Sequence, residues 1–377
     1  MDFQWTQDQV DLKNMTQEFI AKEVAPYAGE MDAAGGMRPG LQEKFHEMGL
    51  LNLIVPEEYG GPGLDAMTVA LLYEEIGKGC AGVATSIAAN ALAAYPVLLL
   101  GTDAQKKFFF DKLNEGKLAA FALTEPNAGS DAGGVVTSAV KDGNEYVLNG
   151  NKCFITNASN AEIFVVFANT RKAAGIRGLT AFVLEKGTPG FSVGKKEEKM
   201  GICASDTCEL ILDGVRVPEE QRIGREGEGF KLAMKTLDAA RPLVGAVSVG
   251  ISQAALDCAV KYAKERQQFN KPVASFQLVQ AMVADMAMQI EAARLLVHKA
   301  CWLKDQGMPY SKEAAMAKCF ASDVAMKVTV DAVQVMGGYG YSKEYPAEKY
   351  MRDAKIMQIY EGTNQIQRLV IANAVLY

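Results

Sequence analysis

The sequence predicts an α+β multidomain protein in which a helical N-terminal part is followed by a small β unit and then by a helical bundle. Three observations predict this order. Residues up to about 115 carry helical patterns, a stretch starting near residue 120 carries short strand-like runs, and helical patterns return after residue 230. A chain of 377 residues is long enough for two or three packed units with a large core.

The N-terminal part begins with a helix signal. Thr6 and Gln9 have the spacing of a capping box, in which each side chain satisfies a backbone N–H of the other residue. Pro26 ends or kinks the helix that follows. The Gly/Pro-rich stretch 56–65 predicts a loop, and Ala/Leu-rich helices are expected over 66–115.

The middle part reads as strands separated by turns. Because no long helical pattern interrupts the strand runs, an antiparallel barrel or sandwich is favoured over a βαβ sheet. Glycine accepts positive φ without steric cost, so dipeptides that end in glycine are turn signals. Those in this part are Asp142-Gly143, Asn149-Gly150 and Asp213-Gly214.

The C-terminal part contains a clear helical seam. Apolar residues that recur every three or four positions predict one buried face in a helical bundle. Ser275, just before the seam, is the expected N-cap. The seam residues are Phe276, Val279, Val283, Met286, Ile290, Ala293, Val297 and Ala300.

Composition and charge exclude several classes. Apolar residues make up 49% and charged residues 22%, as in ordinary soluble proteins, and the net charge of −6 argues against a nucleic-acid surface. No stretch approaches about 18 uninterrupted apolar residues, so no membrane span is expected. The first 19 residues resemble neither a secretory signal nor a transit peptide. A cytoplasmic bacterial protein is expected, ahead of a mature mitochondrial matrix protein.

Cysteine and histidine usage points away from disulfides and zinc. The seven cysteines are scattered and form no CxxC pair, so buried reduced thiols are expected. Only His46 and His298 occur, which excludes a zinc site built on several histidines. The Rossmann, P-loop and HExxH patterns are all missing. A nucleotide cofactor, if used, is therefore held in some other way.

Four stretches combine residues that suit a ligand site, although each also has a plain structural explanation. In 121–134 the small residues leave backbone N–H groups open to an anion or a polar ring, or form an ordinary domain-crossing loop. The strand 152–159 suits a cofactor wall or the core. The loop 266–277 carries an arginine suited to a pyrophosphate, or is a solvated helix end. The paired glycines in 334–341 permit a close backbone approach or break a helix.

The stretch "YEGTNQIQR" (360–368) places an acid, Glu361, directly before the flexible Gly362. Such a carboxylate is either a solvated residue at a helix end or a base whose backbone closely approaches a ligand. The surrounding sequence has to decide between them.

Taken together, these stretches resemble the acyl-CoA dehydrogenase family. The two signature regions are "ALTEPNAGSDAGG" and "QVMGGYGY…YEGTNQIQR". The resemblance spans essentially the whole chain, with "YGGPGLD", "KCFITNA", "KMGICASDTCEL", "LDAARP" and "ERQQFNKPVASFQ" in family order and at family-like spacing. Within the family, the chain resembles short- and medium-chain members and the butyryl-CoA dehydrogenases of anaerobic bacteria.

The resemblance implies three domains: a helical one over 1–119, a β-domain over 120–226 and a four-helix bundle over 227–377. It also implies one FAD per subunit and a homotetramer arranged as a dimer of dimers. The implied partners are an acyl-CoA or enoyl-CoA substrate and electron-transfer flavoprotein.

The resemblance also implies where the cofactor and the substrate bind. Residues of 121–130 and 154–156 would line the flavin, and a second set would hold the pyrophosphate and adenosine, partly across a subunit interface. The implied cofactor residues are Phe121, Leu123, Thr124, Ser130, Phe154, Ile155, Thr156, Arg266, Phe269, Gln277, Gln334, Gly337, Gly338, Thr363, Asn364 and Gln365. The implied substrate residues are Ser130, Asp238, Arg241, Tyr360 and Gly362.

Glu361 fits the catalytic base that the resemblance implies. In the family a base removes the α-proton of an acyl-CoA thioester while the β-hydrogen leaves as hydride to flavin N5. The enolate-like charge is stabilised by preorganised donors, including the backbone N–H of the base. Some branches place the base just before the arginine of the "LDxxR" region, but here that position is Ala240.

Phe154 departs from the many members that have tryptophan at this position. A phenylalanine still packs against a flavin but lacks the indole N–H. In this it resembles enzymes that reduce enoyl-CoA or work with an electron-bifurcating partner, so the direction of the reaction stays open. The neighbouring Cys153 either tunes the flavin's surroundings or is buried filler.

The substrate is predicted as a short-chain acyl-CoA. The expected pocket wall, 86–101, contains no Lys or Arg, which disfavours a dicarboxylic substrate. Medium- or branched-chain dehydrogenation and an acyl-CoA oxidase-like reaction are the alternatives within enzymes. A non-catalytic, nucleic-acid-binding relative is the alternative from another class.

Overall fold

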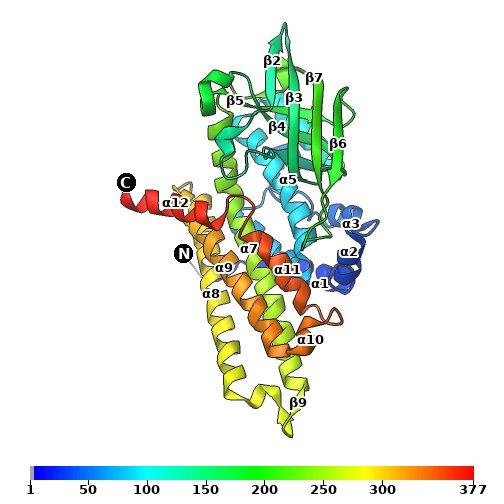
Figure 1. Cartoon of the computed structure of the whole chain (residues 1–377), viewed down its shortest axis with the longest axis vertical. Helices are drawn as coiled ribbons and strands as arrows, with labels where there is room; N and C mark the ends of the chain where they lie inside the picture. The colour runs from blue at the N-terminus through cyan, green and yellow to red at the C-terminus, as the bar shows by residue number, and fades with distance from the viewer. Residues whose placement is uncertain (1–3) are drawn as a thin grey trace.

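The computed structural model describes residues 4–377 and confirms the predicted three-part fold class. The β-sheet lies at one end of the long axis and a bundle of long helices at the other (Figure 1). The N-terminal helices lie beside the junction, with α5 running between the two parts (Figure 1). The first three residues of the predicted 1–119 domain lie outside the described residues.

The N-terminal part contains the predicted helices. Thr6 Oγ1 accepts from the Gln9 N–H and the Gln9 side chain accepts from the Thr6 N–H, which confirms the capping box. The first helix stops at Glu23, before Pro26, as predicted. The helices are α1 (Gln7–Glu23), α2 (Ala28–Ala34), α3 (Leu41–Glu47), α4 (Ala66–Gly79), α5 (Ala81–Leu100) and α6 (Asp103–Asn114).

The middle part is an eight-stranded sheet in the order β6-β7-β3-β2-β4-β5-β8, with β1 also paired to β4. The sheet is mixed rather than antiparallel throughout: most neighbouring strands pair antiparallel as predicted, but β1 and β4 run parallel. β1 enters directly from α6 and meets β4 by a long connection rather than a hairpin, which permits parallel pairing. The strands are β1 (Leu118–Ala122), β2 (Ser138–Asp142), β3 (Glu145–Thr156), β4 (Ala161–Asn169), β5 (Leu179–Glu185), β6 (Phe191–Lys196), β7 (Thr207–Pro218) and β8 (Arg222–Ile223).

Only one of the three turn signals marks a turn. Asp142-Gly143 begins the β2–β3 hairpin connection, with Gly143 at φ 62°. The other two glycine dipeptides lie inside paired strands, where Asn149 of β3 faces both Asp213 and Gly214 of β7. Two residues opposite one make a β-bulge, and Gly214 N–H donates to Asn149 Oδ1 at 2.8 Å. The glycines therefore serve a strand irregularity that local sequence does not distinguish from a turn.

The C-terminal part packs α7 (Gly229–Glu265), α8 (Gln277–Asp305), α9 (Ser311–Met336) and α11 (Ala347–Met357) against one another. The seam of α8 is buried from Met286 to Ala300. The predicted cap was wrong: Ser275 ends a 3₁₀ turn, and Phe276 precedes α8 without a side-chain cap. The remaining elements are β9 (Gln267–Gln268), β10 (Lys271–Pro272), α10 (Gly338–Tyr341) and α12 (Asn364–Leu376).

Two helices, α5 and α7, are long and apolar enough to cross a membrane by length and composition. Most of the apolar window of each is buried inside the protein, 72% for α5 and 78% for α7. Both helices are therefore buried like core helices, and their apolar side chains pack the domains together. All seven cysteines are unpaired; five are buried as expected, whereas Cys203 and Cys258 are only partly buried.

Candidate active site

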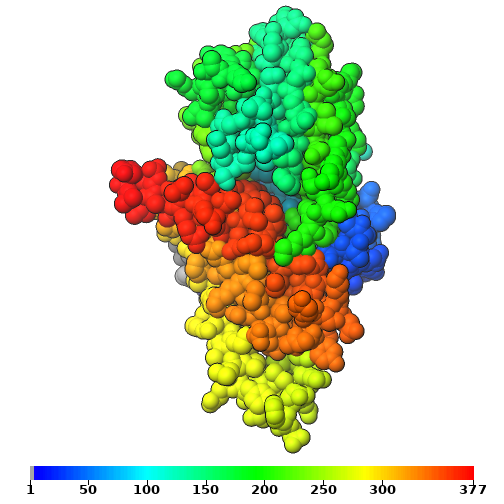
Figure 2. Space-filling view, viewed as in Figure 1, coloured from blue at the N-terminus to red at the C-terminus, as the bar shows by residue number. Residues whose placement is uncertain are grey.

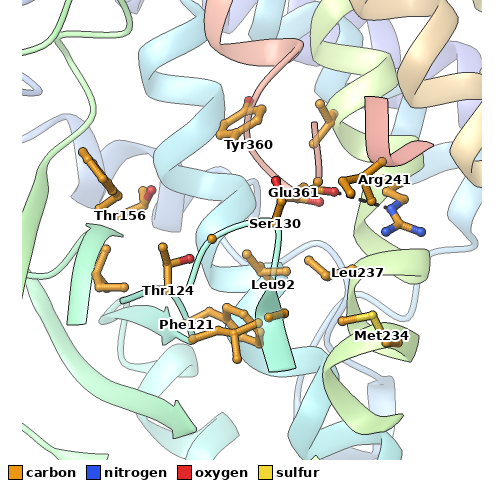
Figure 3. Close-up of a pocket in the computed structure, with 18 of the residues that line it drawn as sticks. Leu92, Phe121, Thr124, Ser130, Thr156, Met234, Leu237, Arg241, Tyr360 and Glu361 are labelled. Carbon is orange, nitrogen blue, oxygen red and sulfur yellow. Dashed lines mark hydrogen bonds between the residues drawn. The ribbon is translucent and has the colours of Figure 1, made fainter. Parts of the chain in front are cut away.

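A cavity of about 320 Å³ lies where the sheet domain, α5, α7 and the segment after α11 meet (Figure 3). Figure 2 shows the surface hollowed where the 121–134 loop faces the chain around residue 360. Leu92 comes from α5, Met234 and Leu237 come from α7, and Phe121 and Thr124 come from the sheet domain (Figure 3). Three parts of the chain that are far apart in sequence therefore build one chamber.

The sheet-domain wall carries polar groups without partners. The hydroxyls of Thr124, Ser130 and Thr156 line the cavity, and none hydrogen-bonds to a residue within 4–377. Phe154 lies beside them at φ 56°, with 64% of its surface exposed. An open aromatic face beside free hydroxyls suits a planar ring with polar edges, such as a flavin. The residues present therefore fit an isoalloxazine.

A buried ion pair fixes this wall. Glu125 accepts hydrogen bonds from the Val136 N–H at 2.8 Å and the Thr137 N–H at 3.0 Å, so its carboxylate closes the 121–137 loop on itself. Lys152 of β3 reaches the same carboxylate at 2.7 Å and also donates to the Leu123 carbonyl at 3.1 Å. The loop is thus tied to the strand that carries Phe154.

Glu361 lies on the opposite wall, in a turn between α11 and α12. It has φ 54°, an uncommon value for a residue other than glycine, and Gly362 follows at φ 91°. Gln367 Nε2 donates to the Glu361 carbonyl at 3.3 Å and to the Gly362 carbonyl at 3.0 Å. The Glu361 N–H makes no hydrogen bond to any described residue. The carbonyls of the turn therefore accept hydrogen bonds from the protein, whereas the Glu361 N–H donates none within the described chain.

The Glu361 carboxyl is held in a dry environment. Its Oε2 atom is buried and has no hydrogen-bond partner among residues 4–377. Burial raises the pKa of Glu361 to about 7, while the positive charges of Lys318 and Arg241 pull that pKa down. A carboxyl that titrates near neutral pH and faces a cavity has the properties of a general base.

Arg241 and Tyr360 complete this wall (Figure 3). Arg241 is only 4% exposed, pairs with Asp238 at 2.5 Å, and its Nε lies 3.5 Å from the Glu361 carbonyl oxygen. Tyr360 donates its hydroxyl to Met357 Sδ at 2.8 Å. Asp238 itself does not line the cavity and acts on it through Arg241.

The cavity brings together eleven of the residues that the sequence singled out, from two of the three predicted domains. Gly362 is one that the geometry explains, since a Cβ there would lie 2.6 Å from Gln367 Nε2. The eleven are Phe121, Leu123, Thr124, Ser130, Phe154, Ile155, Thr156, Arg241, Tyr360, Glu361 and Gly362.

A second group lies at the far end of the helical domain, near the β9 hairpin and α10 (Figure 1). Arg266, Gly337 and Gly338 line a separate groove there. Phe269 occupies the hairpin tip, 87% exposed, and Gln277 and Gln334 are also exposed. A single chain therefore does not join these residues to the cavity.

A third group begins α12. Thr363 is the N-cap and accepts from the Ile366 N–H at 3.3 Å, while Gln365 is exposed. Asn364 is buried, and its amide bonds to Lys318, Ser322 and Asp323 of α9. The Asn364 side chain is thus engaged within the chain.

Sequence reasoning missed two residues beside Glu361, namely Lys318 and Gln367. Lys318 had a readable signal, because a lysine among alanines on the buried face of a helix is rarely left there without a polar task. Gln367 had none, because its contacts with the turn depend on how α12 packs.

Models of the acyl-CoA dehydrogenase family match three consecutive parts of the chain. The "Acyl-CoA dehydrogenase, N-terminal domain" matches residues 6–117, the "middle domain" matches 120–215 and the "C-terminal domain" matches 227–376. Together they cover most of the sequence.

Curated relatives agree along the full length. The chain is 50% identical to the short-chain specific acyl-CoA dehydrogenase of Megasphaera elsdenii, with all of both chains covered. It is 46% identical to the acryloyl-CoA reductase (NADH) of Anaerotignum propionicum, covering 100% of this chain and 96% of the relative.

Solved structures share the fold closely. The butyryl-CoA dehydrogenase of M. elsdenii superposes with a TM-score of 0.97 at 50% identity. A chain from a structure described as the electron transferring flavoprotein of Acidaminococcus fermentans superposes with a TM-score of 0.98 at 52% identity. Both matches cover all of each chain.

The fold and the cavity, read with these matches, define a flavin-dependent oxidoreductase that acts on CH–CH bonds. The chain belongs to the acyl-CoA dehydrogenase family, as its sequence motifs suggested. Its cofactor is FAD, and its reaction is acyl-CoA dehydrogenation.

Proposed function

We propose that the protein interconverts a short-chain acyl-CoA and its trans-2-enoyl-CoA, with Glu361 as the base that takes the α-proton. The observation that carries this proposal is the buried, unpartnered Glu361 Oε2 on the wall of the cavity. A carboxylate without a competing donor keeps its lone pair available for a C–H proton. Gly362 and Tyr360 shape the chamber around it.

The chain also supplies donors for the substrate. A pKa of about 7 leaves roughly half of the Glu361 side chains ionised at neutral pH. The unused Glu361 N–H is suited to the thioester carbonyl oxygen, where negative charge develops as the α-proton leaves. Bound FAD supplies the acceptor for the hydrogen that leaves Cβ. Ser130 and Arg241 are proposed to contact the CoA part, with Asp238 holding Arg241 in place.

We assign the flavin ring to the sheet-domain wall formed by Phe121, Leu123, Thr124, Ser130, Phe154, Ile155 and Thr156. The second group of residues, near the β9 hairpin and α10, lies far from this cavity in a single chain. These residues contact the same FAD only if a second copy of the chain brings them to the cavity. The exposed residues of this group, Arg266, Phe269, Gln277, Gln334, Gly337 and Gly338, support a homotetramer built from dimers. Thr363 and Gln365 are proposed to reach the nucleotide part. The domain boundaries are proposed at 119/120 and 226/227.

The short acyl chain of the substrate is proposed from the relatives. Two of the relatives named above are described as short-chain or butyryl-CoA dehydrogenases. Medium- or branched-chain substrates remain the alternative. The relative described as an acryloyl-CoA reductase supports reduction as the second candidate direction. Electron-transfer flavoprotein is the proposed electron partner, and a bacterial cytoplasm the proposed location.

The test is an anaerobic titration of the purified holoenzyme with a panel of acyl-CoAs while flavin absorbance is followed. Butyryl-CoA is expected to bleach wild type, and Glu361→Gln is expected to bind without bleaching. Normal bleaching by Glu361→Gln would remove Glu361 as the base. If no acyl-CoA bleaches wild type, the corresponding enoyl-CoAs are added to the reduced protein to test the reverse direction.

Two other readings make different predictions. An acyl-CoA oxidase would reoxidise rapidly in air with product bound, whereas slow reoxidation in stopped flow is expected here. A non-catalytic nucleic-acid-binding relative would retain DNA on a filter at low salt, whereas no retention is expected from a chain with a net charge of −6.

A further inference from the structure

Lys318 of α9 is a buried cation beside the Glu361 turn. Its side chain is 0% exposed, and its Nζ donates to the Gly362 carbonyl at 2.8 Å and to Asn364 Oδ1 at 2.9 Å. Both acceptors are neutral. Placing a charge in such a site is costly, and buried lysines are normally paired.

The other two buried lysines of the described chain follow that rule. Lys152 pairs with Glu125 at 2.7 Å, and Lys349 pairs with Asp353 at 2.5 Å. Lys318 forms no ion pair with any residue of 4–377. Burial lowers the pKa of Lys318 to about 8, while the negative charge of Glu361 acts in the opposite direction. The site therefore disfavours the charged form of Lys318. It also offers no carboxylate partner among the described residues that would explain why a lysine is buried there.

The contacts of Lys318 hold the turn that carries Glu361. Glu361 and Gly362 both have positive φ, and a left-handed conformation at a residue other than glycine costs about 1–2 kcal/mol. Lys318 and Gln367 both donate to the Gly362 carbonyl, and Lys318 also reaches Asn364 in the first turn of α12. These bonds fix the turn from the side away from the cavity.

The charges around this site distinguish Lys318 from Arg241. Arg241 of α7 faces Glu361 but is paired with Asp238. Asp323 of α9 is paired with Arg368 of α12. The remaining titratable groups that act on Lys318 or Glu361 are Cys319 of α9, Tyr73 of α4 and Tyr360. Lys318 is thus the cation near Glu361 that no carboxylate neutralises directly.

We propose that Lys318 is a positioning residue for the base: its ammonium holds the Glu361–Gly362 turn, and its charge favours the ionised carboxylate of Glu361 at neutral pH. The inference rests on the proposed role of Glu361. A buried carboxyl without a nearby cation stays protonated to higher pH, and a protonated carboxyl is no base. Because the ammonium bonds to a carbonyl rather than to the carboxylate, the Glu361 oxygens remain free for the substrate.

The test is the pH dependence of flavin bleaching by butyryl-CoA in the holoenzyme. Lys318→Met removes both the bonds and the charge, whereas Lys318→Gln removes the charge but keeps an amide N–H donor on a side chain one atom shorter. In both, the acid limb of the profile is expected to move up by about one pH unit. At pH 7 this shift slows bleaching about five-fold, because the ionised fraction falls from about half to about a tenth. Lys318→Arg is expected to keep the wild-type limb.

Two controls separate charge from structure. Lys327→Met removes an exposed lysine of the same helix, which pairs with Asp331, and should leave the limb unchanged. Asn364→Ala removes one acceptor of Lys318 but keeps its charge, and should lower the rate equally at all pH values. If Asn364→Ala moves the limb as far as Lys318→Gln, turn geometry and not charge sets it, and the proposal is wrong.

The proposal also fails if Lys318→Gln retains FAD, melts like wild type and keeps the wild-type limb. Should Lys318→Met lose its flavin, Lys318→Gln and Asn364→Ala still decide the question. A wild type that does not bleach, or a Glu361→Gln that bleaches normally, would instead overturn the role of Glu361. The two failures are therefore distinguishable.

Discussion

Lys152 Nζ lies 2.7 Å from Glu125 Oε1, and each side chain is at most 1% exposed. This pair connects β3, which carries Phe154, with the loop that carries Thr124 and Ser130. The pair is buried behind the wall of the cavity and is not among the residues that line it. The cavity therefore depends on an ion pair that does not line it.

Lys152→Met is expected to destabilise the protein by about 3–5 kcal/mol, because Glu125 would stay buried without its cation. Thermal melting followed by circular dichroism checks this. Lys141→Met, which breaks an exposed pair with Glu219, is the control and should cost about 1 kcal/mol or less. Equal melting of the two variants would contradict a structural role for the buried pair.

The pH profile of kcat/KM should have an acid limb near pH 7. Glu361 is a base only when ionised, and its pKa is raised to about 7 by burial. Below that value kcat/KM is expected to fall about ten-fold per pH unit. A limb near pH 4.5, the ordinary value for a glutamate, would show that Glu361 is not buried in the working enzyme.

Glu361→Gln should be more stable than wild type at alkaline pH. The folded-state pKa of Glu361 lies above its unfolded value, so its stabilising effect is present below about pH 4.5 and is lost as pH rises through 7. Glu361→Gln does not lose this stability as pH rises. Above pH 7 its free energy of unfolding should therefore exceed that of wild type by at most about 3 kcal/mol. Urea unfolding at pH 5 and pH 8 measures this difference in the free energy of unfolding. A difference no larger at pH 8 than at pH 5 would refute the prediction.

Gly362→Ala should lose activity while remaining folded. Gly362 has φ 91°, and an added Cβ would lie 2.6 Å from Gln367 Nε2, which holds the Glu361 carbonyl. The strain is expected to cost about 1–3 kcal/mol and to displace the base. Bleaching by butyryl-CoA should slow at least about ten-fold. Gly187→Ala, at φ 83° with nothing within 4 Å, is the matched control and should bleach normally.

Phe154→Ala should weaken FAD binding with little effect on folding. Its side chain is 64% exposed on the cavity wall, so few protein contacts are lost. Loss of aromatic stacking is expected to weaken flavin affinity by about three- to ten-fold. Flavin fluorescence titration of the apoprotein measures it. Val140→Ala, at an exposed position on β2 outside the cavity lining, should bind FAD like wild type.

The sequence by itself determined the features that depend on neighbouring residues. The Thr6–Gln9 capping box, the stop before Pro26 and the order of helical and strand segments follow from local hydrogen bonding and side-chain periodicity. Its motifs also singled out Glu361, because an acid before a glycine occurs there within a family-specific pattern.

Tertiary structure alone decided the relationships between distant segments. Asn149 meets Asp213-Gly214 in a bulge, and β1 runs parallel to β4, because strand pairing is settled by partners far along the chain. Lys318 approaches Gly362 only because α9 packs against α12. The environment that raises the pKa of Glu361 is likewise made by burial between helices, and burial is a property of the packed chain rather than of any short stretch of it.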